Sequence, residues 1–255
     1  MFSRNRTTTV LAVATVVMAS FVLTATSALA ATIVNTTWTT TTDTTNDWVT
    51  GNSSGTWTWT INSGVIVTLG NNTNNTGRLF VGISSNSVNQ TLILTSTDGG
   101  GILNLRGNHS LDPVLGRLGH VGDTGTIEIN GGVSLIGGSN PFRYSTTAGN
   151  AITINNGLVD FTGNGNDPFV RESNGFLTFN IADNMATLIV PGQIDDAADF
   201  TTTWAGASVT ASGSNPLSFD FDSIANETTI TAVPEPRAAL LGGLGLLALL
   251  RRRRG

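Results

Sequence analysis

The sequence predicts an all-β fold, and its composition, its short alternating runs and a repeat together indicate this class. Thr, Asn, Gly, Ser and branched apolar residues dominate, whereas charged residues make up only 11% of the chain. Thr and β-branched residues favour strands, and Gly and Asn supply turn conformations. Apolar and polar residues alternate over residues 65–69, 91–94, 127–129 and 151–154, which is the period of a half-buried strand. Residues 31–232 show no long apolar pattern at helical spacing.

A repeat with a period of about 25 residues refines this prediction, since periods of this length are typical of solenoids. The segments 101–107, 125–131, 150–156 and 175–181 align with one another, and their first apolar positions recur at this interval. Such a repeat, with short strands and glycine corners, predicts a right-handed parallel β-solenoid, whose stacked coils share one core. The expected columns are Leu103, Ile127, Ile152 and Leu177; Leu105, Ile129, Ile154 and Phe179; and Asn130, Asn155 and Asn180. An antiparallel β-sandwich, whose regular hairpins imitate a repeat, is the alternative.

The two flanks of the predicted solenoid, which we place at residues 64–190, differ from the repeats. Residues 31–63 are rich in Thr and contain Trp38, Trp48, Trp57 and Trp59. Because the first coil of a solenoid needs a cover, we expect an N-terminal cap there. A sugar-stacking surface is the alternative interpretation of these tryptophans. Residues 191–232 interrupt the period, and we expect them to close the other end.

The N-terminus has the layout of a secretory signal peptide over residues 1–30. Arg4 and Arg6 precede an apolar run at 10–23, which we expect to form the signal helix, and Ala28 and Ala30 provide small residues before a cleavage site. We expect export through the Sec translocon, followed by cleavage between Ala30 and Ala31 by signal peptidase. An uncleaved membrane anchor is the alternative.

The charge of residues 31–232 excludes some classes of function. This body contains five Arg, no Lys and sixteen acidic residues, so its formal net charge is −11. Nucleic-acid binding requires neutralisation of phosphates, so we expect no nucleic-acid partner. Cys is absent, which leaves no disulfides or thiolate metal sites to stabilise an exported domain.

Two groups of polar residues are candidates for chemistry. Arg117, His120 and Asp123 could perform general acid–base work on a polysaccharide, although the glycines around them read equally well as a loop between coils. Several acids could bind calcium or simply be solvated, and they are Asp195, Asp196, Asp199, Asp220 and Asp222. Neither group matches a known catalytic or metal spacing. We therefore expect no catalytic residues, no cofactor and no metal.

The C-terminal segment 233–255 carries the strongest signal. Val233, Pro234, Glu235 and Pro236 precede thirteen uncharged residues at 238–250. As a helix these would span about 20 Å, against about 30 Å for a hydrocarbon core, so the predicted membrane helix is marginal. The chain then carries the basic residues Arg251, Arg252, Arg253 and Arg254, which the positive-inside rule assigns to the cytoplasm.

This segment resembles the PEP-CTERM sorting domain of exosortase-dependent Gram-negative bacteria. The resemblance rests on Pro234-Glu235-Pro236, the glycine-containing apolar segment, the terminal arginines and the signal peptide on the same chain. It implies recognition by an exosortase, processing near residues 234–236, and transient anchoring in the membrane before delivery to the outer envelope or extracellular matrix. It also implies exopolysaccharide as a possible partner. The body looks, more loosely, like autotransporter-type β-helix repeat proteins.

These observations predict an exported structural protein of the cell surface or extracellular matrix, without catalytic activity of its own. A β-helix that binds or cleaves polysaccharide through the face of Arg117, His120 and Asp123 is the alternative.

Overall fold

The computed structural model describes residues 31–44, 48–50, 53–70, 77–82, 89–106, 116–119, 123–144, 149–165, 167–172, 174–213 and 215–233. Several predicted features lie outside these residues. They are the signal peptide with Ala28 and Ala30, His120, the sorting residues Pro234, Glu235 and Pro236, the apolar segment 238–250, and the arginines at 251–254.

The described strands belong to three sheets, which we call sheets A, B and C. Sheet A has the order β1 (Ala31–Thr32), β4 (Trp48–Val49), β7 (Leu79–Val81), β10 (Gly116–Leu118), β13 (Phe142–Tyr144) and β16 (Phe169–Arg171). Sheet B has the order β19 (Ala207–Ala211), β17 (Leu177–Ile181), β14 (Asn150–Ile154), β11 (Thr124–Ile129), β8 (Asn89–Thr95), β5 (Gly55–Ile61) and β2 (Thr36–Trp38). Sheet C has the order β20 (Leu217–Asp222), β21 (Glu227–Ala232), β18 (Ala186–Pro191), β15 (Gly157–Asp160), β12 (Val133–Gly137), β9 (Ile102–Leu105), β6 (Ile66–Leu69) and β3 (Thr42–Thr44).

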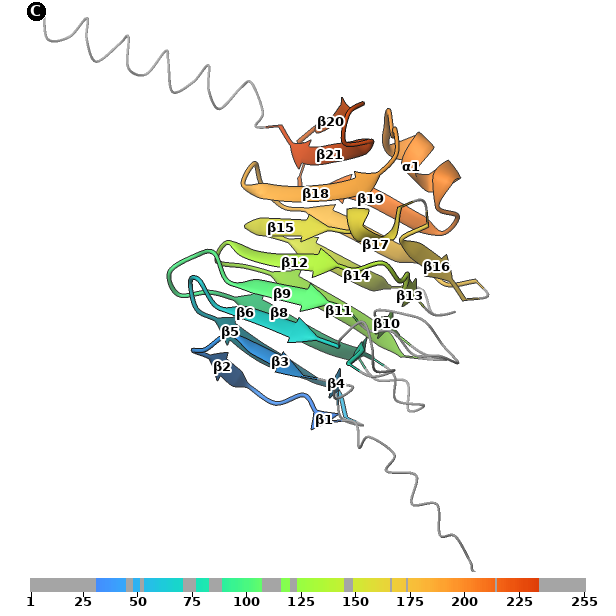
Figure 1. The fold of residues 1–255 in the computed structure, drawn as a ribbon. Helices are drawn as coiled ribbons and strands as arrows, with labels where there is room; N and C mark the ends of the chain where they lie inside the picture. Colours follow the sequence, from blue (N-terminus) through green and yellow to red (C-terminus); the bar gives the residue numbers. More distant parts are fainter. Residues whose placement is uncertain are drawn as a thin grey trace, which may run out of the picture.

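Pairing within the sheets follows a simple rule for β1 to β15. Each strand pairs in parallel with the strand three positions later in the sequence, as β8 does with β11 and β11 with β14. Figure 1 shows the strands stacked in sequence order, from β1–β3 at one end to β20 and β21 at the other. The all-β prediction is confirmed. The repeat strands are not the antiparallel neighbours that the β-sandwich alternative requires.

One apolar core runs through all three sheets. Along β11, residues alternate between half-buried and buried, and Ile127 and Ile129 are completely buried. The same alternation holds in β12 and β14, because successive side chains on a strand point to opposite faces. The inward residues form one continuous cluster from Ile33 to Ala232.

The predicted core columns are confirmed only in part. Ile127 pairs with Ile152, and Ile129 with Ile154, as expected. Leu103 and Leu105 were placed wrongly, because their strand β9 belongs to sheet C, where Leu103 pairs with Leu135.

Leu177 and Phe179 were also placed wrongly, by two residues. Ile152 pairs with Phe179, and Asn150 with Leu177. The step along the chain from Ile127 to its partner Ile152 is therefore two residues shorter than the step from Ile152 to Phe179. The intervening segment contains a 3-10 turn at Thr162–Asn164, and the longer connection shifts the alignment.

The predicted asparagine column contains only its first two members. Asn155 Nδ2 donates a hydrogen bond to Asn130 Oδ1 at 2.8 Å, which confirms their stacking. Asn180 instead pairs with Thr153, because of the same two-residue shift.

Aromatic residues pack at both ends of the stack. Trp38, Trp48 and Trp59 pack edge to face, with ring centroids 5.2–5.9 Å apart, and Trp59 is fully buried. At the opposite end, a short helix that the sequence analysis did not predict, α1 (Ala197–Thr203), buries Phe200 against Trp204. Beside it β21 runs antiparallel to both β18 and β20, which ends the parallel pairing. Within the described parts of the chain, no helix has the length and apolar character that crossing a bilayer requires.

Candidate functional site

The most prominent polar cluster of the described residues lies on sheet A. Arg117 in β10 is the register partner of Arg143 in β13, so the two side chains lie on adjacent strands. Their neighbours Leu118 and Tyr144 are buried, whereas both arginines are half-buried on the outer side. Strands in a sheet are about 4.8 Å apart, so two positive charges on adjacent strands need a counter-charge nearby.

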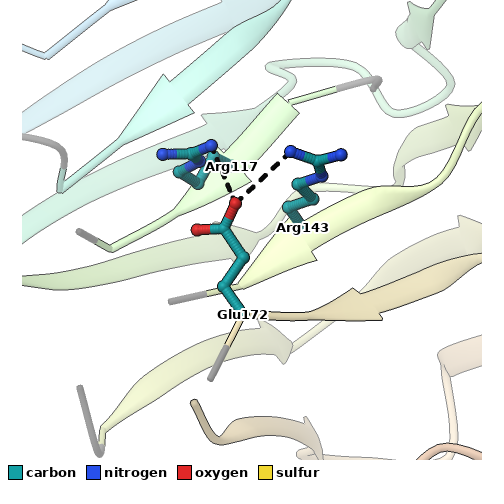
Figure 2. Close-up of polar contacts among 3 residues, drawn as sticks. All are labelled: Arg117, Arg143 and Glu172. Atoms are coloured by element: carbon teal, nitrogen blue, oxygen red, sulfur yellow. Dashed lines mark hydrogen bonds and ion pairs between the residues drawn. The ribbon is translucent and has the colours of Figure 1, made fainter. Parts of the chain in front are cut away.

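Glu172, directly after β16, supplies this counter-charge (Figure 2). Its Oε1 lies 2.8 Å from Arg117 Nη2 and 3.4 Å from Arg143 Nη1. The three side chains are only 19–27% exposed, so solvent screens these ion pairs less than it screens pairs on an open surface. One carboxylate between two guanidinium groups leaves a net positive cluster on an otherwise acidic body.

The basic character extends along the same sheet. Arg117 is also the register partner of Phe80 in β7, and the guanidinium carbon of Arg78 lies 4.8 Å from the centre of the Phe80 ring. Four of the five arginines in residues 31–232, including Arg171 in β16, therefore lie on or directly before successive strands of sheet A. Their planar guanidinium groups suit carboxylate or sulfate ligands.

Two of the three residues in the alternative acid–base group, Arg117 and Asp123, are described by the structure. Arg117 is engaged by Glu172, and Asp123 is fully buried, so a polymer in solution does not meet its carboxylate. His120 lies outside the described residues.

The acids around α1 have local structural roles. Asp196 is the N-cap of α1, and its Oδ1 accepts from the backbone N–H groups of Ala198 and Asp199 at 2.8 and 2.7 Å. Asp199 Oδ2 accepts from Asp195 N at 3.1 Å. Asp196 therefore caps the helix, and the Asp195 carboxylate accepts from Gln193 Nε2 at 2.9 Å.

Asp220 and Asp222 line an open depression of about 420 Å³, together with Ile224 and Glu227. Asp222 Oδ1 accepts from the backbone N–H groups of Ile224 and Ala225, so it stabilises the turn between β20 and β21. In the part of the chain that the structure describes, no three His, Cys, Asp or Glu residues are grouped as metal ligands.

Tyr144 is a buried titratable group that the sequence analysis did not single out. Its hydroxyl donates to the carbonyl oxygen of Ala205 at 2.8 Å. Burial raises the pKa of Tyr144 to about 12, with a smaller lowering by Arg171 and a smaller raising by Asp167. The phenol therefore stays protonated and links sheet A to the segment after α1.

The predicted sorting signal begins where the described structure ends. Val233 follows β21 directly, and its N–H donates to Pro216 O at 2.8 Å.

Comparison with known proteins gives no relative for this chain: no family model, curated protein or solved structure matches it.

Proposed function

We propose that this protein is a right-handed parallel β-solenoid that serves as an exported structural component of the cell surface or extracellular matrix. In this proposal an exosortase recognises the C-terminal segment 233–255 and processes it. The observation that carries the proposal is the order Pro234-Glu235-Pro236, apolar segment, arginine cluster, beginning one residue after the last strand.

The solenoid part of the proposal draws support from the strand pairing. A chain whose strands pair with the third strand on, in three parallel sheets around one apolar interior, has the connectivity of a coil with three strands per turn. Solenoids need covered ends, because an end coil has no further neighbour. The tryptophan cluster at one end, and α1 with the β20–β21 hairpin at the other, suit this role.

A structural role suits the chemistry of the described side chains. Among the described candidates, Arg117 is engaged in an ion pair, Asp196 caps a helix, Asp222 stabilises a turn, and Asp123 is buried. The body is acidic and rich in Thr and Asn, and its strands are stacked one on the next, which suits a scaffold.

The sorting proposal is tested by replacing Pro234, Glu235 and Pro236 with alanine in the native cell. We expect the wild-type protein to be processed and to leave the membrane, and the variant to stay membrane-bound at the unprocessed mass. Alanines at the exposed turn residues Ser223 and Ile224 form the matched control, which is expected to behave like wild type. Release of the sorting variant at the wild-type rate would show that these residues are not a sorting signal.

A second candidate function is binding of an acidic polysaccharide along sheet A. Arg78, Arg117 and Arg143 favour it, because they place cationic groups on or directly before neighbouring strands of the sheet. Arg117→Gln with Arg143→Gln should then weaken retention on an acidic polysaccharide resin, whereas Arg106→Gln, an exposed residue after β9, should not. New reducing ends or unsaturated products on incubation would instead identify a polysaccharide-cleaving enzyme.

A further inference from the structure

A buried polar cluster lies where sheet A meets sheet B. Thr50 follows β4, Gly82 follows β7, and Gln90 belongs to β8; the side chains of Thr50 and Gln90 are each only 1% exposed. The hydroxyl of Thr50 hydrogen-bonds directly to Gln90 Oε1, although the two residues are 40 positions apart in the sequence. A hydroxyl and a carboxamide are thus held in contact without competing solvent.

The surrounding groups orient the carboxamide as an acyl donor. Its Oε1 accepts the backbone N–H of Gly82 at 2.8 Å, and its Nε2 donates to Ser53 O at 3.0 Å. A backbone N–H directed at the carbonyl oxygen stabilises the negative charge that develops there when a nucleophile adds to the carbon. The hydroxyl, the polarised carbonyl and the positioned amide nitrogen are the nucleophile, the acyl carbon and the leaving group of an acyl transfer.

Gly82 is the residue whose backbone N–H lies close to the Gln90 carboxamide oxygen. It adopts a φ of +75°, and a Cβ at this position would lie 2.7 Å from Gly125 N. A larger residue at position 82 would push the backbone of β11 away. Glycine therefore allows the end of β7 in sheet A to approach β11 in sheet B.

We propose that Thr50 and Gln90 form an intramolecular ester bond. The Thr50 Oγ1–Gln90 Cδ bond forms and the Gln90 Cδ–Nε2 bond breaks. The hydroxyl proton is transferred to the departing nitrogen, which leaves as ammonia. The reaction needs no oxidant, reductant or second substrate, and it lowers the mass of the chain by one ammonia, about 17 Da.

The bond would serve a chain that has no cysteine. An ester between residues 50 and 90 would join β4 to β8 covalently and close a loop of about 40 residues, as a disulfide does in other exported proteins. The inference does not depend on the sorting proposal.

The test is mass spectrometry of the purified full chain under denaturing conditions, followed by trypsin. Arg78 lies between the two residues and the next arginine is Arg106, so cleavage after arginine separates Thr50 from Gln90 unless they are joined. We expect a mass about 17 Da below that of the sequence between the observed termini, and one branched peptide containing both residues. Alkaline hydroxylamine should split this peptide, because it cleaves esters.

Variants separate the proposed chemistry from packing. Thr50→Val keeps the shape of the side chain and should restore the full mass. Asn150→Asp is the matched control and should keep the deficit: Asn150 Oδ1 also accepts a glycine N–H, that of Gly125, at 3.0 Å. A wild-type chain at full mass with two separate tryptic peptides would overturn the proposal, and so would a deficit located on an asparagine. Both readings come from the wild-type protein and do not require any variant to fold.

Discussion

Replacing Phe179 with alanine tests whether the inward-facing residues of sheet B stabilise the C-terminal half of the protein. Phe179 is completely buried between its register partners Ile152 and Val209. Its ring centroid lies 5.0 Å from that of Phe169 and 5.8 Å from that of Phe200, so it joins sheets A and B to α1. Removing it affects all three elements.

The expected loss follows from the burial. Deleting a fully buried phenyl ring costs about 3–5 kcal/mol, because the transfer free energy is lost and a cavity remains. Phe176→Ala is the matched control, since the same atoms are removed from a side chain that is 51% exposed. The contact of Phe176 with the guanidinium carbon of Arg171, 5.2 Å from the ring centre, contributes only about 0.5–1 kcal/mol.

Urea unfolding followed by tryptophan fluorescence distinguishes the two variants. The ring centroids of Trp204 and Phe200 are 4.8 Å apart, so the fluorescence of Trp204 reports on unfolding at this end of the stack. With a slope of about 2–3 kcal/mol/M, Phe179→Ala should lower the midpoint by more than about 1 M and Phe176→Ala by much less. Equal shifts in the two variants, or a loss below about 1 kcal/mol for Phe179→Ala, would refute the assignment of this column to the core.

Three further predictions concern polar groups. The pKa of Tyr144, the single tyrosine, is raised from its ordinary value of 10 to about 12, so the folded state favours the protonated phenol. The stability that this phenol contributes is complete below pH 10 and is lost as the pH rises towards 12. Ultraviolet titration should show ionisation near pH 12 in the native protein and near pH 10 in urea, and identical curves would contradict the burial. Glu172→Gln should lower the free energy of unfolding by about 1–2 kcal/mol, because Arg117 and Arg143 lose their shared partner, and high salt should reduce the difference; a salt-independent loss would point to packing. Asp196→Ala should cost about 1 kcal/mol through loss of the α1 cap, measured by thermal unfolding, and an unchanged transition would show that the cap contributes nothing.

The strands were predictable because their signal is local. Alternation of apolar and polar residues identified β11 and β14 directly, and the spacing of Ile127 and Ile152 identified their pairing. The predicted columns of stacked core residues were wrong where the number of residues between paired strands varied. Leu103 lies one predicted period before Ile127 and so fitted the repeat, yet it occupies another sheet, and the true partner of Ile127 is the more distant Leu92. A constant period cannot distinguish the neighbour of a strand in its own sheet from a strand of another sheet.

The polar clusters were less predictable, since none is local. Glu172 and Arg117 belong to distant parts of the sequence, and their contact depends on the register of three strands in sheet A. The cap of α1 had a readable signal, because Asp196 stands before a short run ending in Phe200, with Asp199 in its first turn. The sequence analysis instead considered these acids as calcium ligands.

The corner of sheets A and B shows how the proposed ester can be separated from an ordinary hydrogen bond. Gln90 and Asn150 both accept a glycine N–H through a side-chain amide oxygen, from Gly82 and Gly125 respectively. Satisfying a buried N–H therefore requires only an amide, because an unpaired buried donor is costly. The Gly82 N–H also donates to Thr50 Oγ1 at 3.0 Å, but the Gln90 carboxamide alone would satisfy this donor. Ester formation is what requires the Thr50 hydroxyl. If Thr50 acts only in packing, neither Thr50→Val nor Asn150→Asp changes the mass by more than the substitution itself. If Thr50 is a nucleophile, Thr50→Val abolishes the loss of ammonia and Asn150→Asp does not.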